Sequence, residues 1–205
     1  MEIEDFLSRD YTGLTDITVT EADIEDAIEH ISSSSAPGLD GIPPVLLKNC
    51  KKSLSRPLCL IWKKSLAQGE ILNILKLGLI ITIHKNGSRT DAKNYRPITL
   101  TSHLIKIIER VIVKKLVKYL EEKSLLNDRQ HGFRKNRSCL SQLMDYYQCL
   151  LNIMETGNAA DVMYSDFTKT FEKVDHGILI KKLTALGIGG SILLKWIHAF
   201  LTNRQ

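Results

Sequence analysis

Hydrophobic and polar positions along the chain repeat mainly with the period of a helix. The segment after Thr20 begins with a capping signature, because Asp23 follows three residues later. Apolar residues then recur at helical spacing, at Ile24, Ala27, Ile28 and Ile31. The same period predicts further helices near Pro44 and over residues 55–68, 102–123, 138–155, 178–186 and 191–201. Glycines at positions 69, 157 and 187 mark three helix ends.

Two segments show a strand pattern instead. The β-branched run Leu79–Ile83 is followed by a polar stretch, Lys85 to Asn94, and then by a return strand that includes Ile98 and Leu100. This arrangement predicts a hairpin. A second short apolar run, Val162 to Phe167, predicts another strand, while residues 32–43 and 130–134 are expected to form loops. The order of elements predicts an α+β fold, helix-rich with a β-hairpin and a small incomplete antiparallel sheet.

The amino-acid composition limits the number of domains and the class of protein. With 205 residues, 43% apolar and 25% charged, the chain can form one large domain or two small ones with a real core. No signal peptide or membrane span is indicated, which predicts an intracellular protein, nuclear or cytoplasmic. The four cysteines contain no C-x-x-C pair and are predicted to be reduced core thiols rather than zinc ligands or disulfides. The oligomeric state stays open.

Charge is distributed unevenly. The formal net charge is +5, yet residues 1–47 carry eleven acids and one base, a net of −10, and the remainder stands at +15. The basic excess gathers in residues 106–118 and 129–137, which favours a phosphate-backbone partner. The alternative is a set of solvated helix faces, and for the helix over 102–123 a core helix with a solvated face is the favoured interpretation.

Four blocks in series carry a family resemblance. They are APGLDGIP at 36–43, NYRPITL at 94–100, QHGFRKNRS at 130–138, and the segment from Asp166 to His176. In this order and spacing they resemble the reverse transcriptases of non-LTR (LINE-type) retrotransposons, over nearly the whole chain from about Ile17. The resemblance implies an RNA-directed DNA polymerase with the fingers and first part of the palm of a right-hand fold. It implies an acidic helical extension and the start of the fingers over 1–76, and the reverse transcriptase domain over 77–205.

The resemblance also implies an active site at the end of the predicted strand. Asp166 matches the first catalytic carboxylate, which binds Mg²⁺, and the Phe167 carbonyl offers a second oxygen to the metal. Two such ions bridge the incoming triphosphate and the primer 3′ oxygen. Phe171 matches the bulky residue that packs under the sugar and rejects a ribose 2′-hydroxyl. Asp175, by contrast, is expected to cap the following helix.

Further blocks imply contacts with nucleotide and template. Lys85 and Arg96 match residues that hold the triphosphate of the incoming dNTP, where fixed cations suit phosphate. Gln130, Phe133 and Arg134 match a block that lies along the template, where a ring stacks on bases and a guanidinium meets phosphate. The implied partners are an RNA template, a DNA primer and a dNTP, with no membrane.

The chain departs from the family pattern at several places. Glu172 stands where Asp is usual, His84 replaces a common Pro, and Thr170 takes a position normally filled by Ala. The chain also contains no Pro-Gln-Gly segment and no Asp-Asp dipeptide. One carboxylate alone does not hold two divalent ions in line, so a fragment truncated before the second catalytic motif is expected, inactive by itself.

Other functions stay open at this point. A noncatalytic RNA-binding or maturase-like module would keep the basic surfaces and bind RNA in a salt-sensitive way without needing Asp166. A metal-dependent hydrolase would have to assemble Asp161, Asp166, Glu172 and Asp175, although residues five apart point to opposite faces of a strand. A relic without function would expose an apolar edge.

Overall fold

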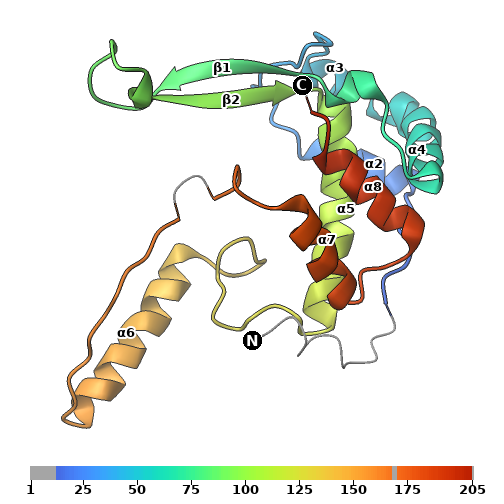
Figure 1. Cartoon of the computed structure of the whole chain (residues 1–205). Coiled ribbons are helices and arrows are strands. Elements are labelled where there is room, and N and C mark those ends of the chain that lie inside the picture. Colours follow the sequence, from blue (N-terminus) through green and yellow to red (C-terminus); the bar gives the residue numbers. More distant parts are fainter. Residues whose placement is uncertain (1–12, 168–169, 205) are drawn as a thin grey trace. The chain divides into compact units, whose positions relative to one another are not determined.

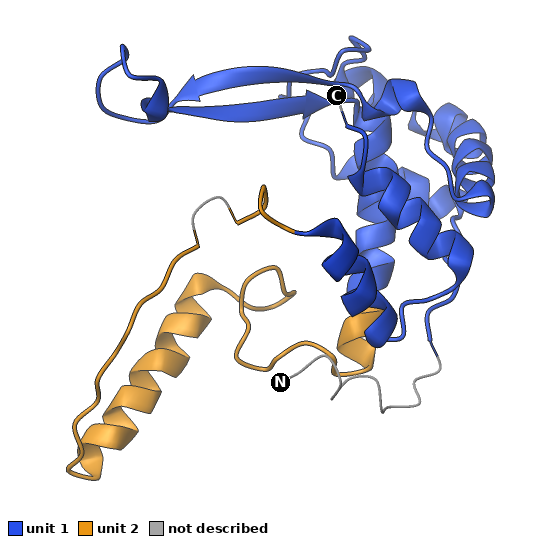
Figure 2. Ribbon diagram, viewed as in Figure 1, with its two compact units in different colours: residues 1–117, 175–205 blue, residues 118–174 orange. Residues whose placement is uncertain are grey.

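The chain folds into helices and one small sheet. A computed structural model describes residues 13–167 and 170–204 (Figure 1). Two compact units are present, residues 1–117 with 175–205 (unit 1) and residues 118–174 (unit 2), shown in blue and orange in Figure 2. The first twelve residues of the predicted acidic extension, and Thr168 and Lys169 of the predicted active-site segment, lie outside the described residues. A helix-rich α+β architecture with an antiparallel hairpin is confirmed.

The elements follow one another in the order that the hydrophobic pattern predicts. The helices are α2 (Glu21–Glu29), α3 (Pro44–Asn49), α4 (Lys51–Gln68), α5 (His103–Glu122), α6 (Cys139–Glu155), α7 (His176–Ala185) and α8 (Ser191–Leu201). The strands are β1 (Gly78–His84) and β2 (Tyr95–Thr101), and the short 3₁₀ turns are η1 (Asn73–Lys76) and η2 (Ala92–Asn94). Helix α5 runs from unit 1 into unit 2, and α6 belongs to unit 2.

Side-chain caps fix the helix ends. The Thr20 hydroxyl accepts a hydrogen bond from the Asp23 amide at 3.1 Å, and the Asp23 carboxylate accepts one from the Thr20 amide at 3.0 Å. This reciprocal pair is the predicted capping box. Asp175 likewise accepts from the Ile178 amide at 2.8 Å, which confirms its predicted role as the cap of α7. Gly69, with φ +65°, ends α4 in the left-handed conformation that glycine adopts without steric cost.

The core of unit 1 is aromatic and aliphatic. Helix α4 packs against α2 and α8, and Trp62 and Trp196 are only 1% and 2% exposed. The other large fully buried apolar side chains are Val19, Ile24, Ile28, Ile107, Ile108 and Ile188. The Trp196 indole donates to the Ser65 hydroxyl at 2.9 Å, so its polar atom is satisfied. These residues confirm the predicted apolar faces of the helices in unit 1.

The acidic side of α2 meets basic residues of α5. Asp23 and Lys115 form an ion pair at 3.0 Å, as do Asp26 and Lys114. Burial works against ionisation of Asp23, but hydrogen bonds from Lys115 and Thr20 prevail and lower its pKa. The hydrogen bond from Lys114 lowers the pKa of Asp26. Part of the basic cluster at 106–118 is therefore neutralised inside unit 1, and α5 is the core helix with a solvated face that was expected.

The loop at residues 32–43 is held from two sides. Within it, Asp40 accepts a hydrogen bond from the Ile42 amide at 3.1 Å. From α5, the buried His103 ring places Nε2 at 3.1 Å from the Ala36 carbonyl. Burial lowers the pKa of His103, so the neutral ring donates to that carbonyl near pH 7.

The predicted hairpin is confirmed with its full register. Strands β1 and β2 pair antiparallel from Gly78 opposite Thr101 to His84 opposite Tyr95. The connecting residues, 85–94, form the tip, which includes η2. In Figure 1 the hairpin extends as a long two-stranded ribbon away from the helices of unit 1. Most of its side chains are exposed on both faces.

The strand predicted over Val162 to Phe167 is wrong. These residues have no regular secondary structure, and all are exposed, Tyr164 at 80%. A strand is stabilised by hydrogen bonds to a neighbouring strand, and none of the described residues pairs with this segment. A tyrosine contact is what holds it locally, because the hydroxyls of Tyr146 and Tyr164 lie 2.7 Å apart.

The cysteine prediction holds for only part of the set. No disulfide joins the four thiols, all of which lie among the described residues. Cys59 is buried, with Sγ 3.4 Å from the Val19 carbonyl. Cys139 and Cys149 are exposed, so the expectation of core thiols is wrong for both. The reason is that α6 contains no buried residue, although its sequence is amphipathic.

Candidate functional site

The hairpin brings two predicted nucleotide-binding residues together. The Lys85 amide donates to the Asn94 carbonyl at 2.7 Å, which extends the β1–β2 ladder by one pair. Arg96 lies opposite Ile83 in the register, two residues beyond Asn94. Side chains two residues apart on a strand share a face, so Lys85 and Arg96 are diagonal neighbours on the same face of the hairpin.

Both cations are available for a ligand. Lys85 and Arg96 are exposed, and none of residues 13–167 and 170–204 forms an ion pair with either of them. A guanidinium fork and an ammonium group on one face suit a polyphosphate, because both stay charged at neutral pH. This face of the hairpin is therefore a candidate anion site.

Side chains of the motif around Arg96 brace the hairpin tip. Asn94 donates through Nδ2 to the Ser88 carbonyl at 2.9 Å, and the Tyr95 hydroxyl donates to the Arg89 carbonyl at 3.0 Å. The tip also needs glycine at position 87, where φ is +78° and a Cβ would lie 2.7 Å from Asn94 Nδ2. Asn94 and Tyr95 thus shape the loop next to Arg96.

His84, a departure from the family pattern, has a local role at the same tip. Its Nε2 lies 3.1 Å from the Gly87 carbonyl, and its ring centroid is 5.3 Å from that of Tyr95 in an edge-to-face arrangement. The sequence contains no signal for these contacts, since they form across the turn and depend on the hairpin register.

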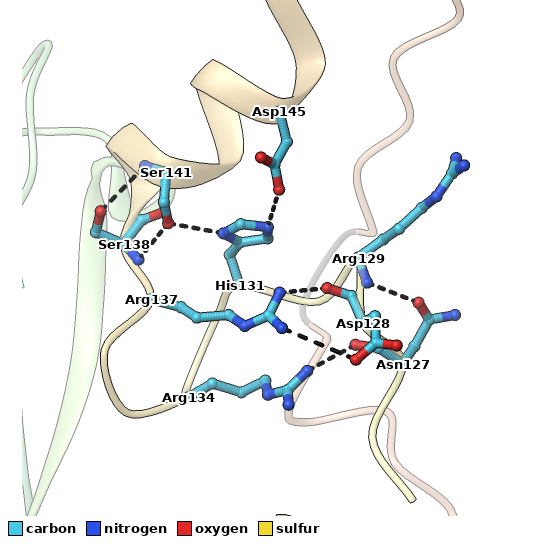
Figure 3. A network of polar contacts seen from close by, with 9 residues as sticks. All are labelled: Asn127, Asp128, Arg129, His131, Arg134, Arg137, Ser138, Ser141 and Asp145. Atoms are coloured by element: carbon cyan, nitrogen blue, oxygen red, sulfur yellow. Dashed lines mark hydrogen bonds and ion pairs between the residues drawn. The ribbon is translucent and has the colours of Figure 1, made fainter. Parts of the chain in front are cut away.

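In unit 2 a polar network fixes the loop at residues 127–138, which contains the predicted template block (Figure 3). The Asn127 side chain accepts from the Arg129 amide at 2.9 Å, and the Asn127 carbonyl accepts from the Gln130 amide at 2.9 Å. Arg137 donates to the Asp128 carbonyl, and its guanidinium is 3.9 Å from the Asp128 carboxylate. The loop therefore folds on itself through hydrogen bonds of its own residues.

Arg134 is the most heavily bonded side chain of this loop. Its Nε and Nη2 donate to the two carboxylate oxygens of Glu121 at 2.8 and 2.5 Å, and Nη1 donates to the Asn127 carbonyl at 2.9 Å. Its side chain is only 9% exposed. The hydrogen bond between them lowers the pKa of Glu121 and raises that of Arg134. The structure thus gives Arg134 internal partners within unit 2.

Phe133 points away from the loop. It is 89% exposed, and its backbone adopts φ +61°, a left-handed conformation that costs an ordinary L-residue roughly 1–2 kcal/mol. Its ring centroid lies 6.4 Å from that of Phe171, edge to face. Gln130, also exposed, donates through Nε2 to the Gly132 carbonyl at 3.3 Å. The structure therefore brings together Phe133 and Phe171, predicted site residues from two different sequence blocks.

The predicted metal-binding residues lie on the irregular segment. Asp166 and Phe167 are both exposed. A carboxylate and a main-chain carbonyl are the hard oxygen donors that Mg²⁺ prefers, so their chemistry fits the metal. The Phe167 carbonyl, however, accepts a hydrogen bond from the Thr170 hydroxyl at 2.9 Å. Thr170 is one of the departures from the family pattern, and its hydroxyl uses one of the two lone pairs of this carbonyl.

The hydrolase hypothesis is wrong for the described part of the chain. No group of three or more His, Cys, Asp or Glu side chains that could hold a metal ion occurs there. The four carboxylates of that hypothesis, at positions 161, 166, 172 and 175, are all described, so they are not assembled. Asp175 instead caps α7.

Comparison with known proteins gives the family. Residues 83–205, more than half of the chain, match the family described as reverse transcriptase (RNA-dependent DNA polymerase). The chain therefore belongs to the reverse transcriptase family.

Its relatives come from transposable elements. The chain is 29% identical over 165 residues to the probable RNA-directed DNA polymerase from transposon BS of Drosophila melanogaster, covering 80% of this chain and 18% of that protein. It is 28% identical over 183 residues to the RNA-directed DNA polymerase from mobile element jockey of the same organism, covering 88% and 20%. A Pol polyprotein from retrotransposable element R2 of Popillia japonica is 31% identical over 108 residues, covering 52% and 14%.

These relatives confirm the resemblance to non-LTR retrotransposon reverse transcriptases and do not favour a noncatalytic module. The chain spans about a fifth or less of the length of the curated relatives that it matches. None of the described helices has the length and apolar character that a membrane span would need.

Proposed function

We propose that this chain contributes the fingers and the first part of the palm to an RNA-directed DNA polymerase that copies an RNA template by extending a DNA primer. Residues 1–76 would form an N-terminal helical extension and the start of the fingers, and residues 77–205 the reverse transcriptase domain proper. One observation carries the proposal best. In a chain of this family, Lys85 and Arg96 are cations on one exposed face of a braced hairpin, and neither forms an ion pair with the described residues.

The hairpin face binds the triphosphate of the incoming dNTP in this proposal. The braced tip holds the strand backbone, so both cations approach the phosphates from a fixed base. Arg96 offers a planar fork and Lys85 a point charge, which together neutralise a polyphosphate without covalent chemistry.

The loop at 127–138 contacts the template. Exposed Phe133 offers a ring on which a base stacks, and Gln130 offers an amide. The role of Arg134 in this proposal is to fix the loop, because its guanidinium already donates hydrogen bonds to Glu121 and Asn127.

Asp166 and the Phe167 carbonyl would hold Mg²⁺ in the assembled enzyme, and Phe171 would pack under the sugar. When bound, the metal neutralises charge on the phosphates and on the attacking primer oxygen. In this chain Asp166 supplies the carboxylate, Phe167 the carbonyl and Phe171 the ring. The 205 residues by themselves are predicted not to extend a primer.

The test is equilibrium binding of dTTP, and of a poly(rA)·oligo(dT) primer–template, to the chain, with primer extension on the same duplex. Because charge-assisted contacts to phosphate are strong, Lys85→Gln and Arg96→Gln should each weaken dTTP binding about tenfold. Lys93→Gln is the matched control, since it removes the same charge from the 3₁₀ turn η2 at the hairpin tip, and it should change binding less than about twofold. Unchanged dTTP binding in Arg96→Gln would contradict the proposal.

A further inference from the structure

His131 stands out in unit 2 because its side chain is buried. Among the described residues of unit 2, only Tyr119 and His131 are buried, and the His131 side chain is 6% exposed. A buried imidazole needs partners for both ring nitrogens. His131 has both: Nδ1 lies 2.8 Å from the Ser141 hydroxyl and Nε2 lies 2.9 Å from the Asp145 carboxylate.

These two contacts fasten the loop to the first turns of α6. Ser141 is the third residue of that helix, and Asp145 follows one turn later on the same side. Figure 3 shows the imidazole between the two side chains, with the loop backbone running past it. The loop therefore has a second point of attachment besides Arg134, which binds Glu121 near the end of α5.

The Ser141 hydroxyl lets the attachment persist in either protonation state of the ring. It accepts from the Ser138 amide at 2.9 Å and lies 2.9 Å from the Ser138 carbonyl. With neutral His131, Ser141 donates to Nδ1 and Nε2–H donates to Asp145. With charged His131, Nδ1–H donates to Ser141, which then donates to the Ser138 carbonyl. Every polar atom of the ring is satisfied in both cases.

The order Ser141, His131 and Asp145 is that of a nucleophilic triad, but the surroundings argue for a holding role. The Ser138 amide donates to the Ser141 hydroxyl oxygen in the capping box of α6, and the Ser138 carbonyl offers that hydroxyl a second acceptor beside Nδ1. Asp145 is 72% exposed, so it does not provide the buried carboxylate that orients a catalytic imidazole.

Between the two attachments lies Phe133. His131 is fixed two residues before it and Arg134 one residue after it, while Phe133 itself has φ +61° and an exposed ring. A bulky residue keeps such a backbone conformation only where its surroundings impose it.

We propose that His131 is a positioning residue for template binding, which holds the Phe133 ring outward, ready to stack on a base of single-stranded RNA. The inference rests on the proposed function. His131 itself makes no contact with RNA. Loss of its contacts to Ser141 and Asp145 frees the backbone of residues 131–133, and the ring then has to be ordered when RNA binds.

The test uses F133W as a reporter in an otherwise intact chain. Trp62 and Trp196 are buried, so acrylamide quenches mainly the exposed indole at position 133, and subtracting the emission of the chain without F133W leaves the anisotropy of that indole. In F133W we expect oligo(rU) to quench this emission through stacking. Adding H131L or D145A should lower the anisotropy before RNA is added and weaken RNA binding about tenfold.

Two further measurements distinguish a positioning role of His131 from the loss of a charged contact with RNA and from a general loss of folding. The slope of log affinity against log salt should stay the same in H131L, because no phosphate contact is removed. Replacing Asp145 by asparagine (D145N) instead of alanine should restore RNA binding, since the asparagine amide oxygen still accepts a hydrogen bond from Nε2–H of His131. H30L is the matched control: it removes another histidine beside an aspartate, His30 and Asp26 in unit 1, and should leave RNA binding unchanged.

Unchanged anisotropy and unchanged RNA affinity in both H131L and D145A would overturn the inference. A reduced salt slope in H131L would overturn it too, because that result means direct phosphate contact. If the proposed function itself is wrong, the result is different: the chain without substitutions shows no salt-sensitive RNA binding.

Discussion

The loop at 127–138 and the segment at 161–167 are two irregular stretches of unit 2 that behave differently. Each displays aromatic side chains to solvent, with Phe133 at 89% and Phe167 at 79% exposed. The loop, however, is fixed by the buried His131, by the largely covered Arg134 and by several hydrogen bonds that involve its main chain (Figure 3). Among the described residues, segment 161–167 is held by the contact between the hydroxyls of Tyr146 and Tyr164 and by the hydrogen bond from the Thr170 hydroxyl to the Phe167 carbonyl.

The difference shows what each stretch needs in order to be ordered. A loop can supply its own partners when Asn, Asp, Arg and His side chains reach its main chain. A strand cannot, because its amides and carbonyls point sideways toward another strand. The loop at 127–138 is therefore ordered by residues close to it in the sequence, whereas the segment that contains Asp166 depends on main-chain partners that the described residues do not offer.

The largest expected effect comes from Arg134→Leu. This variant removes three hydrogen bonds, two to the Glu121 carboxylate and one to the Asn127 carbonyl, which keeps its bond from the Gln130 amide. We expect affinity for oligo(rU) to fall by more than about tenfold, because neither Phe133 nor Gln130 is then held in place for the template. Fluorescence anisotropy of labelled RNA measures the affinity.

The salt dependence of Arg134→Leu sharpens this prediction. If Arg134 fixes the loop, the slope of log affinity against log salt is unchanged. If it contacts phosphate directly, the slope falls by about one. The second result would contradict the role assigned to Arg134.

Phe133→Ala and Phe167→Ala form a matched pair for the comparison. Both remove an exposed ring from an irregular stretch. Phe133→Ala should weaken single-stranded RNA binding about tenfold, since one stacking platform is lost. Phe167→Ala should change it less than about twofold, because this ring is not held in place. Equal effects of the two variants would mean that fixation of the loop has no bearing on binding.

Acid should weaken the loop through Glu121. Its pKa is lowered from the ordinary value of 4.5 by the hydrogen bond from Arg134, so the folded state favours the carboxylate. The stabilisation is complete above the ordinary value and is lost as pH falls through the lowered pKa. Anisotropy at position 133 in F133W should therefore decrease below about pH 4.5.

The control for the acid effect is Glu121→Gln in the same background. Glutamine still accepts a hydrogen bond from Arg134 but does not titrate, so the drop over this pH range should disappear. An identical drop in both proteins would show that another group is responsible.

The smallest effect is expected for Ser138→Ala, which removes the hydroxyl that accepts from the Ser141 amide at 3.1 Å. Loss of an N-cap costs about 1 kcal/mol. Circular dichroism at 222 nm during a urea titration should show α6 unfolding earlier, while the buried tryptophans of unit 1 report an unchanged transition. Thr156→Ala at the other end of α6 is the control, since its hydroxyl donates to a carbonyl and not to an N-cap amide.

The sequence predicted the elements that local chemistry determines. The capping box at Thr20 and the cap at Asp175 each join residues three positions apart, and the hairpin joins two strands that follow each other through one short tip. The apolar repeat also located the core helices of unit 1, because burial follows the helical period.

The sequence could not predict contacts that form only after the chain folds. His131 and Asp145 are fourteen residues apart, and Arg134 and Glu121 thirteen, without a periodic signal that links them. The β-branched and aromatic residues of 162–167 indicated a strand. Whether such residues form one depends on neighbouring strands, and the intrinsic propensity of a residue carries no information about them. The same limit applies to Cys139 and Cys149, since an amphipathic helix is buried only where another surface covers it.

Amide hydrogen exchange tests the central difference most directly. We predict slow exchange at Arg129, Gln130, Ser138 and Ser141, whose amides are hydrogen-bonded in the loop network. We predict fast exchange throughout 162–167, where no amide donates a hydrogen bond to any of the described residues. Equal protection of the two stretches, or protection of 162–167 alone, would contradict these predictions.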